Sequence, residues 1–446
     1  MSRHNVHGQG PASRAQPAPA GNLRKFRGRT TEADVAQILL VASRAGEMLL
    51  RSGASAADTV ATTRRITEAL GLRDCLVDVT LTALYLSHRS GPRSAPMTEL
   101  RIIRGASVSY DRIQRVHGFL DDVEAGRVPL GSALRRLDDL DREGPLYPAW
   151  TETVAWAALS GFFTVILRGG WVVFVAACLA AAVVDRANRW LSARGVPVFH
   201  RAVLSGAAAT AMATGLFLAG VTGQAALIVA GGIAVMLPGL AFTGGVQDAI
   251  EGYLVTAAAR TFDAALVTAA LVAGVGAVLY PAVRMGLRVP QVQPGGLDLG
   301  GWSQLPLQLA AAGMVCACLA LCFQARASGL VTAFGSGALG WGLFLVLWQH
   351  LDVPMTIAAA LASVVIGIYA RLLDRFAGLP GPLTVVAGIA PMAPGYVIYQ
   401  GMLHLSHGDT APGVQAIGQA VTVGLALAAG VTFGQMTAGL GVRSKI

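Results

Sequence analysis

The octapeptide GIAVMLPG at Gly232–Gly239 recurs at Gly388–Gly395 as GIAPMAPG, with six of its eight positions identical. The two copies start 156 residues apart, and each lies inside a strongly apolar stretch of the chain. Proline removes a backbone donor and clashes with the preceding helical turn, whereas glycine permits an unwound backbone. The motif therefore predicts that two apolar helices are interrupted at matching positions.

The octapeptide belongs to a longer duplication. At the same offset of 156 residues, segment 263–275 matches segment 419–431 at seven of thirteen positions. Each half contains five apolar stretches, centred near residues 160, 177, 211, 232 and 272 in the first half and near 313, 339, 361, 390 and 427 in the second. Because five is odd, the second half would cross a membrane in the opposite sense, which is the inverted-repeat plan of secondary transporters.

Composition also indicates a membrane protein. Hydrophobic residues make up 54% of the 446 residues, charged residues only 13%, and the mean hydropathy is +0.57. Of the 59 charged residues, 37 lie within residues 1–150. We expect a polytopic α-helical membrane protein of about ten transmembrane helices, arranged as two five-helix inverted repeats and preceded by a small cytoplasmic α+β domain.

The expected organisation can be stated by residue ranges. Thr31 with Asp34, and Ser55 with Asp58, are typical of helix starts, and 75–86 and 98–105 have strand-like patterns that can pair across the Gly91-Pro92 turn. Helices are also expected at about 108–124 and 131–142. The predicted segments are a disordered tail (1–30), the cytoplasmic domain (31–149), membrane repeat 1 (150–285), a linker (286–304), membrane repeat 2 (305–440) and a cytoplasmic tail (441–446).

The distribution of arginine and lysine predicts the orientation. With the N-terminus inside, ten basic residues of the membrane domain and C-terminal tail fall on the cytoplasmic side and three on the other. Positive residues concentrate in cytoplasmic loops of membrane proteins. We therefore expect a multi-pass membrane protein with both termini in the cytoplasm.

The interrupted helices predict a substrate site. Free backbone groups cannot face lipid without a large penalty, but they are tolerated where they line a polar cavity. The residues expected to bind substrate there are Gly232, Met236, Pro238, Gly239, Gly388, Pro391, Met392, Pro394 and Gly395. The alternatives are that the Pro-Gly pairs only kink or end packed helices, and that both methionines are packing residues.

Polar residues near the motifs are candidates for proton coupling or gating. They are Asp248, Arg260, Asp263 and Gln419. Burial of an acid such as Asp263 favours a proton carrier, but Asp263 could instead pair with Arg260 one helical turn away. Asp248 and Glu251 are either gate residues or ordinary loop charges, and His404 and His407 are expected in a solvated loop.

Several functions are disfavoured by the sequence. The two lysines, Lys25 and Lys445, belong to no nucleotide-binding P-loop, and the basic residues form no block typical of nucleic-acid binding. No zinc-protease or serine-hydrolase motif is present, so we expect neither an enzyme nor a metal or cofactor. The cysteines are predicted to be reduced packing residues: Cys75, Cys178, Cys316, Cys318 and Cys322.

Three stretches resemble the bacterial threonine/serine exporter family over about residues 31–440. They are SGASAADTVATTRRITEALGL leading into VDVTLTALYLS (52–87), TGGVQDAIEGYLVTAAARTFDAAL after the first motif (243–266), and GIAPMAPGYVIYQGML (388–403). The resemblance implies export of L-threonine and L-serine driven by the proton-motive force. It also implies an acidic residue after Arg260, where this chain has Asp263. The Pro/Arg-rich tail and the linker RVPQVQPGGLDLGGW (288–302) depart from the family pattern.

The expected partners are a small amino acid, protons and the lipid bilayer, with a homo-oligomer as an open alternative. Three other functions stay open at this point: the same type of carrier for another small metabolite, a channel or sensor gated by the cytoplasmic domain, and a membrane enzyme. The first of these is the most serious rival, because the substrate comes from the family resemblance alone.

Overall fold

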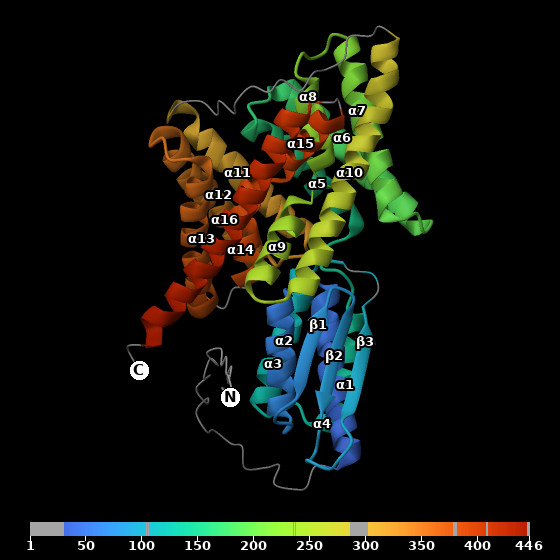
Figure 1. Ribbon diagram of the computed structural model, residues 1–446, viewed down its shortest axis with the longest axis vertical. Coiled ribbons are helices and arrows are strands. Elements are labelled where there is room, and N and C mark those ends of the chain that lie inside the picture. Colours follow the sequence, from blue (N-terminus) through green and yellow to red (C-terminus); the bar gives the residue numbers. More distant parts are fainter. Residues whose placement is uncertain are drawn as a thin grey trace, which may run out of the picture.

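The structure is a computed structural model of the chain. It describes residues 31–103, 105, 107–234, 236, 238–285, 302–377, 381–406 and 409–443. The predicted tail 1–30 and most of the predicted linker lie outside these residues. Figure 1 shows an N-terminal domain of helices and strands at one end of a bundle of longer helices.

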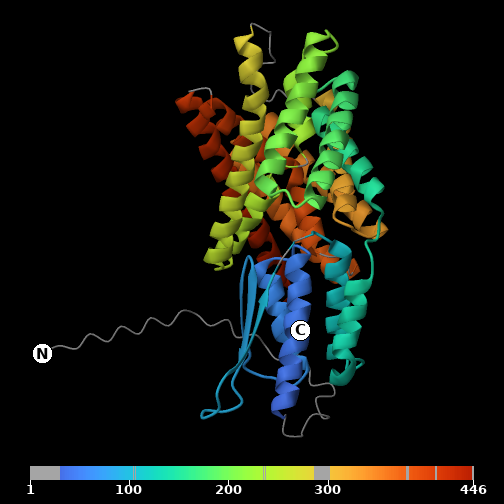
Figure 2. The same cartoon turned by 90° about the vertical axis from the view of Figure 1, so that its right-hand side faces the viewer.

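The N-terminal domain has four helices and three strands in the described residues. Its elements are α1 (Glu32–Arg51), α2 (Ala56–Ala69), β1 (Leu76–Thr80), β2 (Ala83–His88), β3 (Met97–Ile102), α3 (Tyr110–Glu124) and α4 (Leu130–Arg142). The sheet packs on one side of α1, and α3 and α4 pack on the other (Figure 2). Fully buried side chains between these layers, among them Ile38, Leu84 and Leu120, form its core.

Local sequence signals explain where the first two helices begin. The Thr31 side chain accepts the N–H of Asp34 at 3.2 Å, and the Asp34 carboxylate accepts the N–H of Thr31 at 3.0 Å. Ser55 accepts the N–H of Asp58 at 3.1 Å in the same way. These bonds satisfy backbone donors that a helix start leaves unpaired. Both predicted helix starts are confirmed.

One predicted strand is wrong in its extent. The stretch 75–86 was expected to be one strand, but the chain turns back at Leu81 and Thr82, so that β1 and β2 pair antiparallel with Thr80 opposite Ala83. β2 then pairs antiparallel with β3, as expected across the Gly91-Pro92 turn. Alternating apolar residues continue across the turn, which hides it from a pattern-based prediction.

The bundle contains the remaining helices. Its first half holds α5 (Ala149–Ile166), α6 (Trp171–Ala193), α7 (Val198–Leu218), α8 (Ala225–Ala234), α9 (Gly239–Ile250) and α10 (Leu254–Arg284). Its second half holds η1 (Trp302–Gln304), α11 (Leu305–Cys322), α12 (Ala327–Leu345), η2 (Val346–His350), α13 (Met355–Ala377), α14 (Gly381–Ile389), η3 (Ala390–Met392), α15 (Gly395–Ser406) and α16 (Thr410–Arg443). The predicted C-terminal tail is helical as far as Arg443, because α16 continues to that residue.

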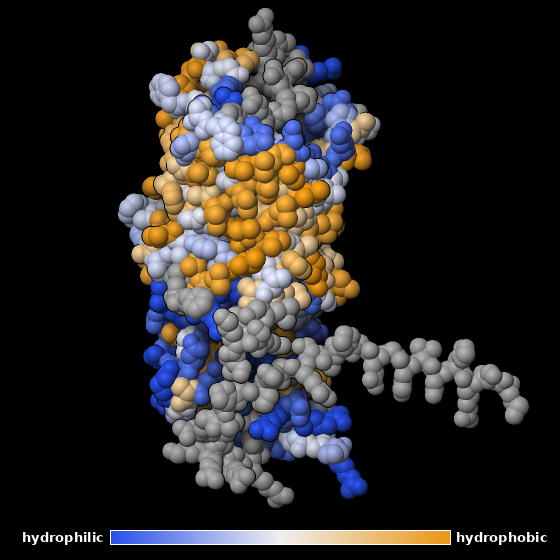
Figure 3. Space-filling view, turned by 90° about the vertical axis from the view of Figure 1, so that its left-hand side faces the viewer, coloured by the Kyte–Doolittle hydropathy of each residue, from blue (hydrophilic) through white to orange (hydrophobic). Residues whose placement is uncertain are grey.

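The protein is a polytopic helical membrane protein. In the described residues seven helices are long and apolar enough to cross a membrane, or eight if the bent pair α8–α9 is one span. On the face shown in Figure 3, a band of hydrophobic side chains crosses the bundle. The sequence predicts ten spans, and the difference comes from α5, which carries Glu152 in its first turn, and from the short helices α14 and α15.

Two pairs of long helices, one pair in each half of the bundle, make close glycine contacts. A Cβ on Gly274 of α10 would overlap the carbonyl oxygen of Val203 in α7. A Cβ on Gly430 of α16 would lie 2.5 Å from the carbonyl oxygen of Ala360 in α13. Small residues let two helix backbones approach closely inside a membrane. The pairs α7–α10 and α13–α16 are therefore held together in the same manner.

Candidate substrate cavity

The first octapeptide interrupts a helix, as predicted. α8 ends at Ala234, α9 begins at Gly239, and the axes of the two helices differ by 52°. Pro238 precedes α9 as its N-cap residue, and its carbonyl oxygen accepts the N–H of Phe242 at 2.9 Å. The break thus places the N-terminal end of α9 and the C-terminal end of α8 in the interior of the bundle.

The second octapeptide interrupts a helix in a related way. α14 ends at Ile389, a single 3-10 turn follows, and α15 begins at Gly395. Ala393 has an extended backbone between them, and the carbonyl oxygen of Pro394 accepts the N–H of Ile398 at 2.9 Å. Proline at this point cannot continue the preceding helix, because it has no N–H to donate.

The two breaks touch each other. A Cβ on Gly239 would lie 2.7 Å from the backbone nitrogen of Gly395 and 3.0 Å from its Cα. Real Cβ atoms do not approach backbone so closely, so only glycine fits at this contact. The Pro-Gly ends of two motifs that are 156 residues apart in sequence therefore meet where the helices α9 and α15 begin.

A cavity of about 1280 Å³ extends from the breaks to the N-terminal domain. Ala234, Pro238, Gly239, Ala390, Ala393 and Gly395 line it at the breaks. Tyr396, Thr432 and Gln435 add polar groups from α15 and α16. At its other end the lining comes from the N-terminal domain and from α9, α10 and α13, with Ser55, Asp58, His117, Gln247, Glu251, Arg260, Asp263, Arg371 and Asp374. The volume exceeds what one amino acid needs.

The residues predicted to bind substrate have two different positions. Pro238, Gly239 and Gly395 line the cavity. The others do not belong to its lining: Gly232, Met236, Gly388, Pro391, Met392 and Pro394. Met392 packs in the core around α11, α12 and α13, and Met236 packs against the core around α6 and α7. The alternative interpretation of both methionines as packing residues agrees with these positions.

The first glycine of each motif serves helix packing. A Cβ on Gly232 would lie 2.9 Å from the Cβ of Ala180 in α6 and 3.1 Å from that of Ala209 in α7. A Cβ on Gly388 would overlap the side chain of Ile366 in α13. A Cβ on Gly340 of α12 would overlap the carbonyl oxygen of Gly388. Each short helix before a break can therefore pack directly against two long helices.

Asp248 and Arg260 form a buried ion pair beside the cavity. Gly245 lets α9 pack against α10, since a Cβ there would lie 3.0 Å from Oγ1 of Thr261. This packing brings Oδ2 of Asp248 within 3.2 Å of Nη1 of Arg260, without the alignment of a hydrogen bond. The Asp248 side chain is 0% exposed and that of Arg260 is 22% exposed. Arg260 therefore makes its ion pair with Asp248, and not with Asp263 as the alternative interpretation proposed.

The N-terminal domain covers this pair with the turn between α1 and α2. The N–H of Ala56 donates to Oδ1 of Asp248 at 3.4 Å, and Nη2 of Arg260 donates to the carbonyl oxygen of Ala54 at 3.4 Å. Nearby, Oγ1 of Thr256 donates to the carbonyl oxygen of Val79 at 3.4 Å. No sequence pattern indicates this contact, because Ala54 and Ala56 have no polar side chain.

A second contact lies at the loop between α11 and α12. The N–H groups of Tyr110 and Asp111 donate to the carbonyl oxygens of Phe323 and Gln324 at 2.9 and 3.2 Å. The Arg326 guanidinium donates to Asp111 at 2.8 Å. The N-terminal domain is therefore attached to both halves of the bundle, on either side of the cavity.

Titratable groups gather where the N-terminal domain closes the cavity. Burial alone would lower the pKa of His117, but the hydrogen bond and charge of Asp58, 3.3 Å away, raise it above its usual value. Burial raises the pKa of Glu251, and the nearby carboxylates of Asp248 and Asp58 raise it further against the hydrogen bond from Gln247. A cationic or protonated partner is thus favoured at this end of the cavity.

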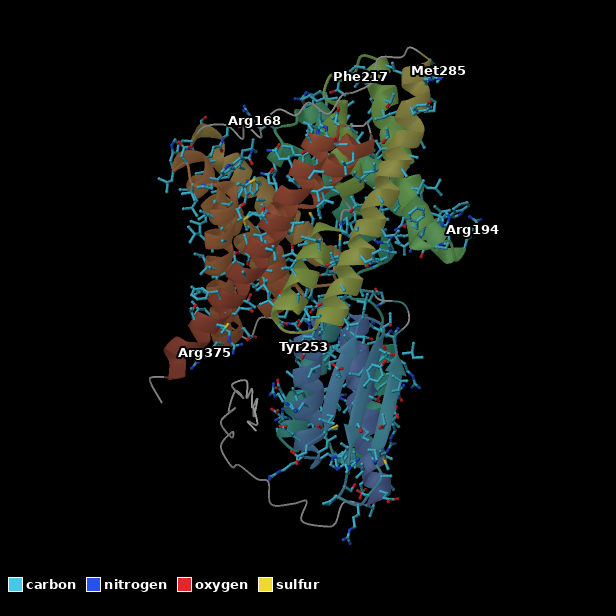
Figure 4. All side chains as sticks on the ribbon, viewed as in Figure 1. Arg168, Arg194, Phe217, Tyr253, Met285 and Arg375 are labelled. Carbon is cyan, nitrogen blue, oxygen red and sulfur yellow. The ribbon has the colours of Figure 1, made fainter. Side chains whose placement is uncertain are left out.

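Asp263 and Gln419 lie at opposite ends of the bundle, although they match in the duplication. Asp263 is in the part of α10 nearer the N-terminal domain, where it lines the cavity but is exposed, so the burial expected of it is not observed. Gln419 is in the part of α16 that follows residue 410, at the other end, and its Nε2 lies 3.1 Å from Sδ of Met355. Figure 4 marks the two ends, with Tyr253 at the N-terminal domain and Arg168 and Met285 far from it.

The histidines and cysteines considered in the sequence have structural roles, except His407, which is not among the residues that the structure describes. The prediction of a loop at His404 is wrong, since this residue lies in α15 and pairs with Asp409 at 3.5 Å. All five cysteines are free, and four of them are buried. Cys316 donates from its thiol to the carbonyl oxygen of Ala387, as a packing residue does.

Two family models match the chain. One, described as "Putative threonine/serine exporter", matches residues 40–280, and one described as "Threonine/Serine exporter, ThrE" matches residues 308–437. A Mycobacterium tuberculosis protein named "Probable threonine/serine exporter" is 29% identical over 442 residues, or 95% of this chain and 81% of that protein. The "Threonine/serine exporter" of Corynebacterium glutamicum is 30% identical over 414 residues, or 92% of this chain and 84% of that protein. No solved structure matches the chain.

Proposed function

Because the chain belongs to the threonine/serine exporter family, we propose that it is a secondary active transporter that exports L-threonine and L-serine from the cytoplasm. The observation that carries the proposal is the similarity to two relatives named for this export, which extends over at least 92% of the chain. Such a protein is a carrier and not an enzyme, and its partners are the amino acid, protons and the lipid bilayer.

The bundle is proposed to contain two inverted repeats of five spans. In each half three long helices are followed by an interrupted pair and one long helix, which makes α5–α10 correspond to α11–α16. The matching glycine contacts of Gly274 and Gly430 support this correspondence. Counting each interrupted pair as one span gives five crossings per half, and the odd number inverts the second half.

The N-terminal domain and both chain ends are proposed to lie in the cytoplasm, with the bundle in the inner membrane. Arg375 lies at the end of the bundle nearer the N-terminal domain, and Arg168 lies at the far end (Figure 4). The excess of arginine on the first side supports a cytoplasmic orientation. In this orientation the cavity faces the compartment from which an exporter takes its substrate.

Binding at the breaks follows from the charges of helix ends. α9 and α15 both begin at the breaks, and the N-terminal end of a helix carries a partial positive charge that stabilises a carboxylate. The carbonyl ends of α8 and α14 suit the ammonium group. Thr432 and Gln435, which line the cavity, can hydrogen-bond the hydroxyl that threonine and serine share. The two repeats then rock about the contact of Gly239 with Gly395 and open the site to the other side.

Proton coupling is assigned to Asp263. It is an acidic residue of a membrane helix and lines the cavity through which substrate would pass. Acidic residues in such positions commonly relay protons in transporters. Entry of a proton from outside would neutralise the carboxylate and return the carrier to its cytoplasm-facing state. Gln419, its counterpart at the far end, cannot change charge in this way.

The test is efflux from proteoliposomes that are preloaded with labelled threonine or serine. We expect saturable efflux that increases when a pH gradient is imposed, and stimulation by unlabelled amino acid on the opposite side, because counterflow distinguishes a carrier from a channel. Efflux without saturation or counterflow would indicate a channel. If protein shown to be folded moves neither amino acid, the substrate assignment is wrong, and a screen of other small metabolites is the next experiment.

A further inference from the structure

The contact between the N-terminal domain and the Asp248–Arg260 pair has a distinctive chemistry. The carboxylate accepts a backbone N–H, from Ala56, and the guanidinium donates to a backbone carbonyl, that of Ala54. Both groups come from one short turn, between α1 and α2. The pair thus recognises a donor and an acceptor that are held close together on a single piece of backbone.

A free amino acid presents the same pattern with full charges. Its ammonium group replaces the amide N–H as the donor, and its carboxylate replaces the amide carbonyl as the acceptor. Each contact to the turn already has one ionised partner, and a zwitterion would add to it the Coulomb attraction between two full charges. Both contacts to the turn are long, at 3.4 Å, and Oδ2 of Asp248 has no well-aligned donor. A zwitterion can therefore satisfy the pair better than the turn does.

We infer that the Asp248–Arg260 pair is the cytoplasmic binding site for the zwitterionic head of the exported amino acid, and that the α1–α2 turn occupies it until substrate displaces the turn. The inference rests on the proposed function and specifies where that function begins. The ammonium group binds Asp248, the carboxylate binds Arg260, and the side chain extends into the cavity, which Arg260 lines.

Burial of the pair supports a role beyond stability. The Asp248 side chain is fully buried, and one of its contacts is a backbone N–H of another domain, 192 residues away in sequence. Removing two charges from water is costly, and a buried ion pair often stabilises a protein less than apolar residues would. An exposed pair of opposite charges at the cavity is, by contrast, what a zwitterion requires.

Displacement of the turn would also move the N-terminal domain. The turn adjoins Ser55 and Asp58, which line the same end of the cavity. When the amino acid takes the place of the turn, these residues withdraw and the cavity opens toward the cytoplasm. The N-terminal domain therefore acts as a gate that competes with substrate, so that the carrier opens when there is an amino acid to export.

Hydrogen exchange of the full-length protein in nanodiscs tests this competition directly. The amides of residues 52–60 should exchange faster when threonine or serine is added at saturating concentration. Threoninol, which lacks the carboxylate, and 2,3-dihydroxybutyrate, which lacks the ammonium group, should not have this effect. Unchanged exchange of this segment with threonine, serine and a panel of other zwitterionic amino acids would overturn the inference.

Variants separate recognition from folding. In Asp248→Asn the side-chain oxygen still accepts the N–H of Ala56 but the charge is gone, so the KM for threonine efflux should rise about tenfold while the turn stays protected. Ala56→Pro removes the competing N–H at the first position of α2, where proline is tolerated, and should lower the KM about threefold. The matched control is Glu68→Gln, an exposed acid on α2 that is expected to leave the KM unchanged.

The outcomes distinguish the inference from the proposed function. If the wild type exports threonine and Asp248→Asn does so with the same KM, the inference is wrong and the function stands. If the wild type exports neither threonine nor serine, the function is wrong. In that case the exchange experiment with the amino-acid panel still decides whether the pair binds a zwitterion.

Discussion

The two halves of the bundle break at the same motif, but they carry different side chains beside the break. The first half has a buried ion pair and an acid at the cavity, in Asp248, Arg260 and Asp263. At the offset of 156 residues the second half has His404, Ala416 and Gln419 in their place. The two halves therefore share the interruption of a helix, while their side chains at the matched positions beside it differ.

This difference separates two requirements of a carrier. Interruption of a helix needs only the backbone properties of proline and glycine, so both halves can meet it with the same eight residues. Coupling to protons needs a titratable group, and the octapeptide contains none. Asp263 of the first half supplies that group in the proposed mechanism.

The largest effect is expected where the halves touch. Gly239→Ala would place a Cβ 2.7 Å from the backbone nitrogen of Gly395, and backbone cannot move aside as a side chain can. Overpacking of this kind costs about 3 kcal/mol, so we expect a marked drop in the melting temperature in detergent and loss of efflux. Gly276→Ala is the control, since a Cβ there meets no atom within 4 Å. If Gly239→Ala and Gly276→Ala were equally stable, the close contact between Gly239 and Gly395 would be contradicted.

The next comparison tests whether both breaks matter. Pro238→Ala and Pro394→Ala each restore a backbone N–H and allow the preceding helix to continue into the next. We expect efflux to fall by about tenfold or more in each, with folding intact by size-exclusion chromatography. Full activity in both variants would refute the proposal that the interrupted helices bind substrate. Loss in only one would confine the site to that half.

A smaller but selective effect on efflux is expected from substitution of Asp263. Asp263→Asn removes a titratable group from the cavity, so efflux down a threonine gradient should continue while its stimulation by a pH gradient disappears. Gln419→Ala, at the corresponding position of the second half, should retain that stimulation, because this side chain lies away from the cavity. If the two variants respond alike to the pH gradient, the assignment of coupling to Asp263 fails.

The smallest effect concerns pH and the N-terminal domain. Because Asp58 raises the pKa of His117 in the folded protein, their ion pair stabilises the fold fully below the unfolded pKa of about 6.5. That contribution is lost as the pH rises through the higher folded pKa. In thermal unfolding, the wild type should therefore lose stability between pH 6 and 8. The loss should be about equal to the difference in stability between the wild type and His117→Gln at pH 6. If the melting temperatures of the two proteins change in parallel with pH, the His117–Asp58 pair is not the source of the pH-dependent stability.

Sequence reasoning predicted local features well because their causes are local. The capping bonds of Thr31 and Ser55 follow from side chains within one helical turn, and the breaks follow from Pro-Gly inside apolar segments. The fold of 75–86 into two strands was missed because the alternation of apolar residues continues across Leu81 and Thr82. Of the residues predicted to bind substrate, Pro238, Gly239 and Gly395 line the cavity while Met236 and Met392 pack in cores, and substrate binding itself stays a prediction.

The sequence by itself determined the apolar bundle, the N-terminal domain, the positions of the two breaks and the family. These properties depend on composition and on short motifs. Apolar length determines which segments can span a membrane, and proline and glycine determine where a helix is interrupted. Only the tertiary structure decided that the two motifs touch at Gly239 and Gly395, and that Asp248 and Arg260 bind the backbone of Ala54 and Ala56. Such contacts join residues far apart in the chain through backbone atoms, and every sequence carries the same backbone atoms.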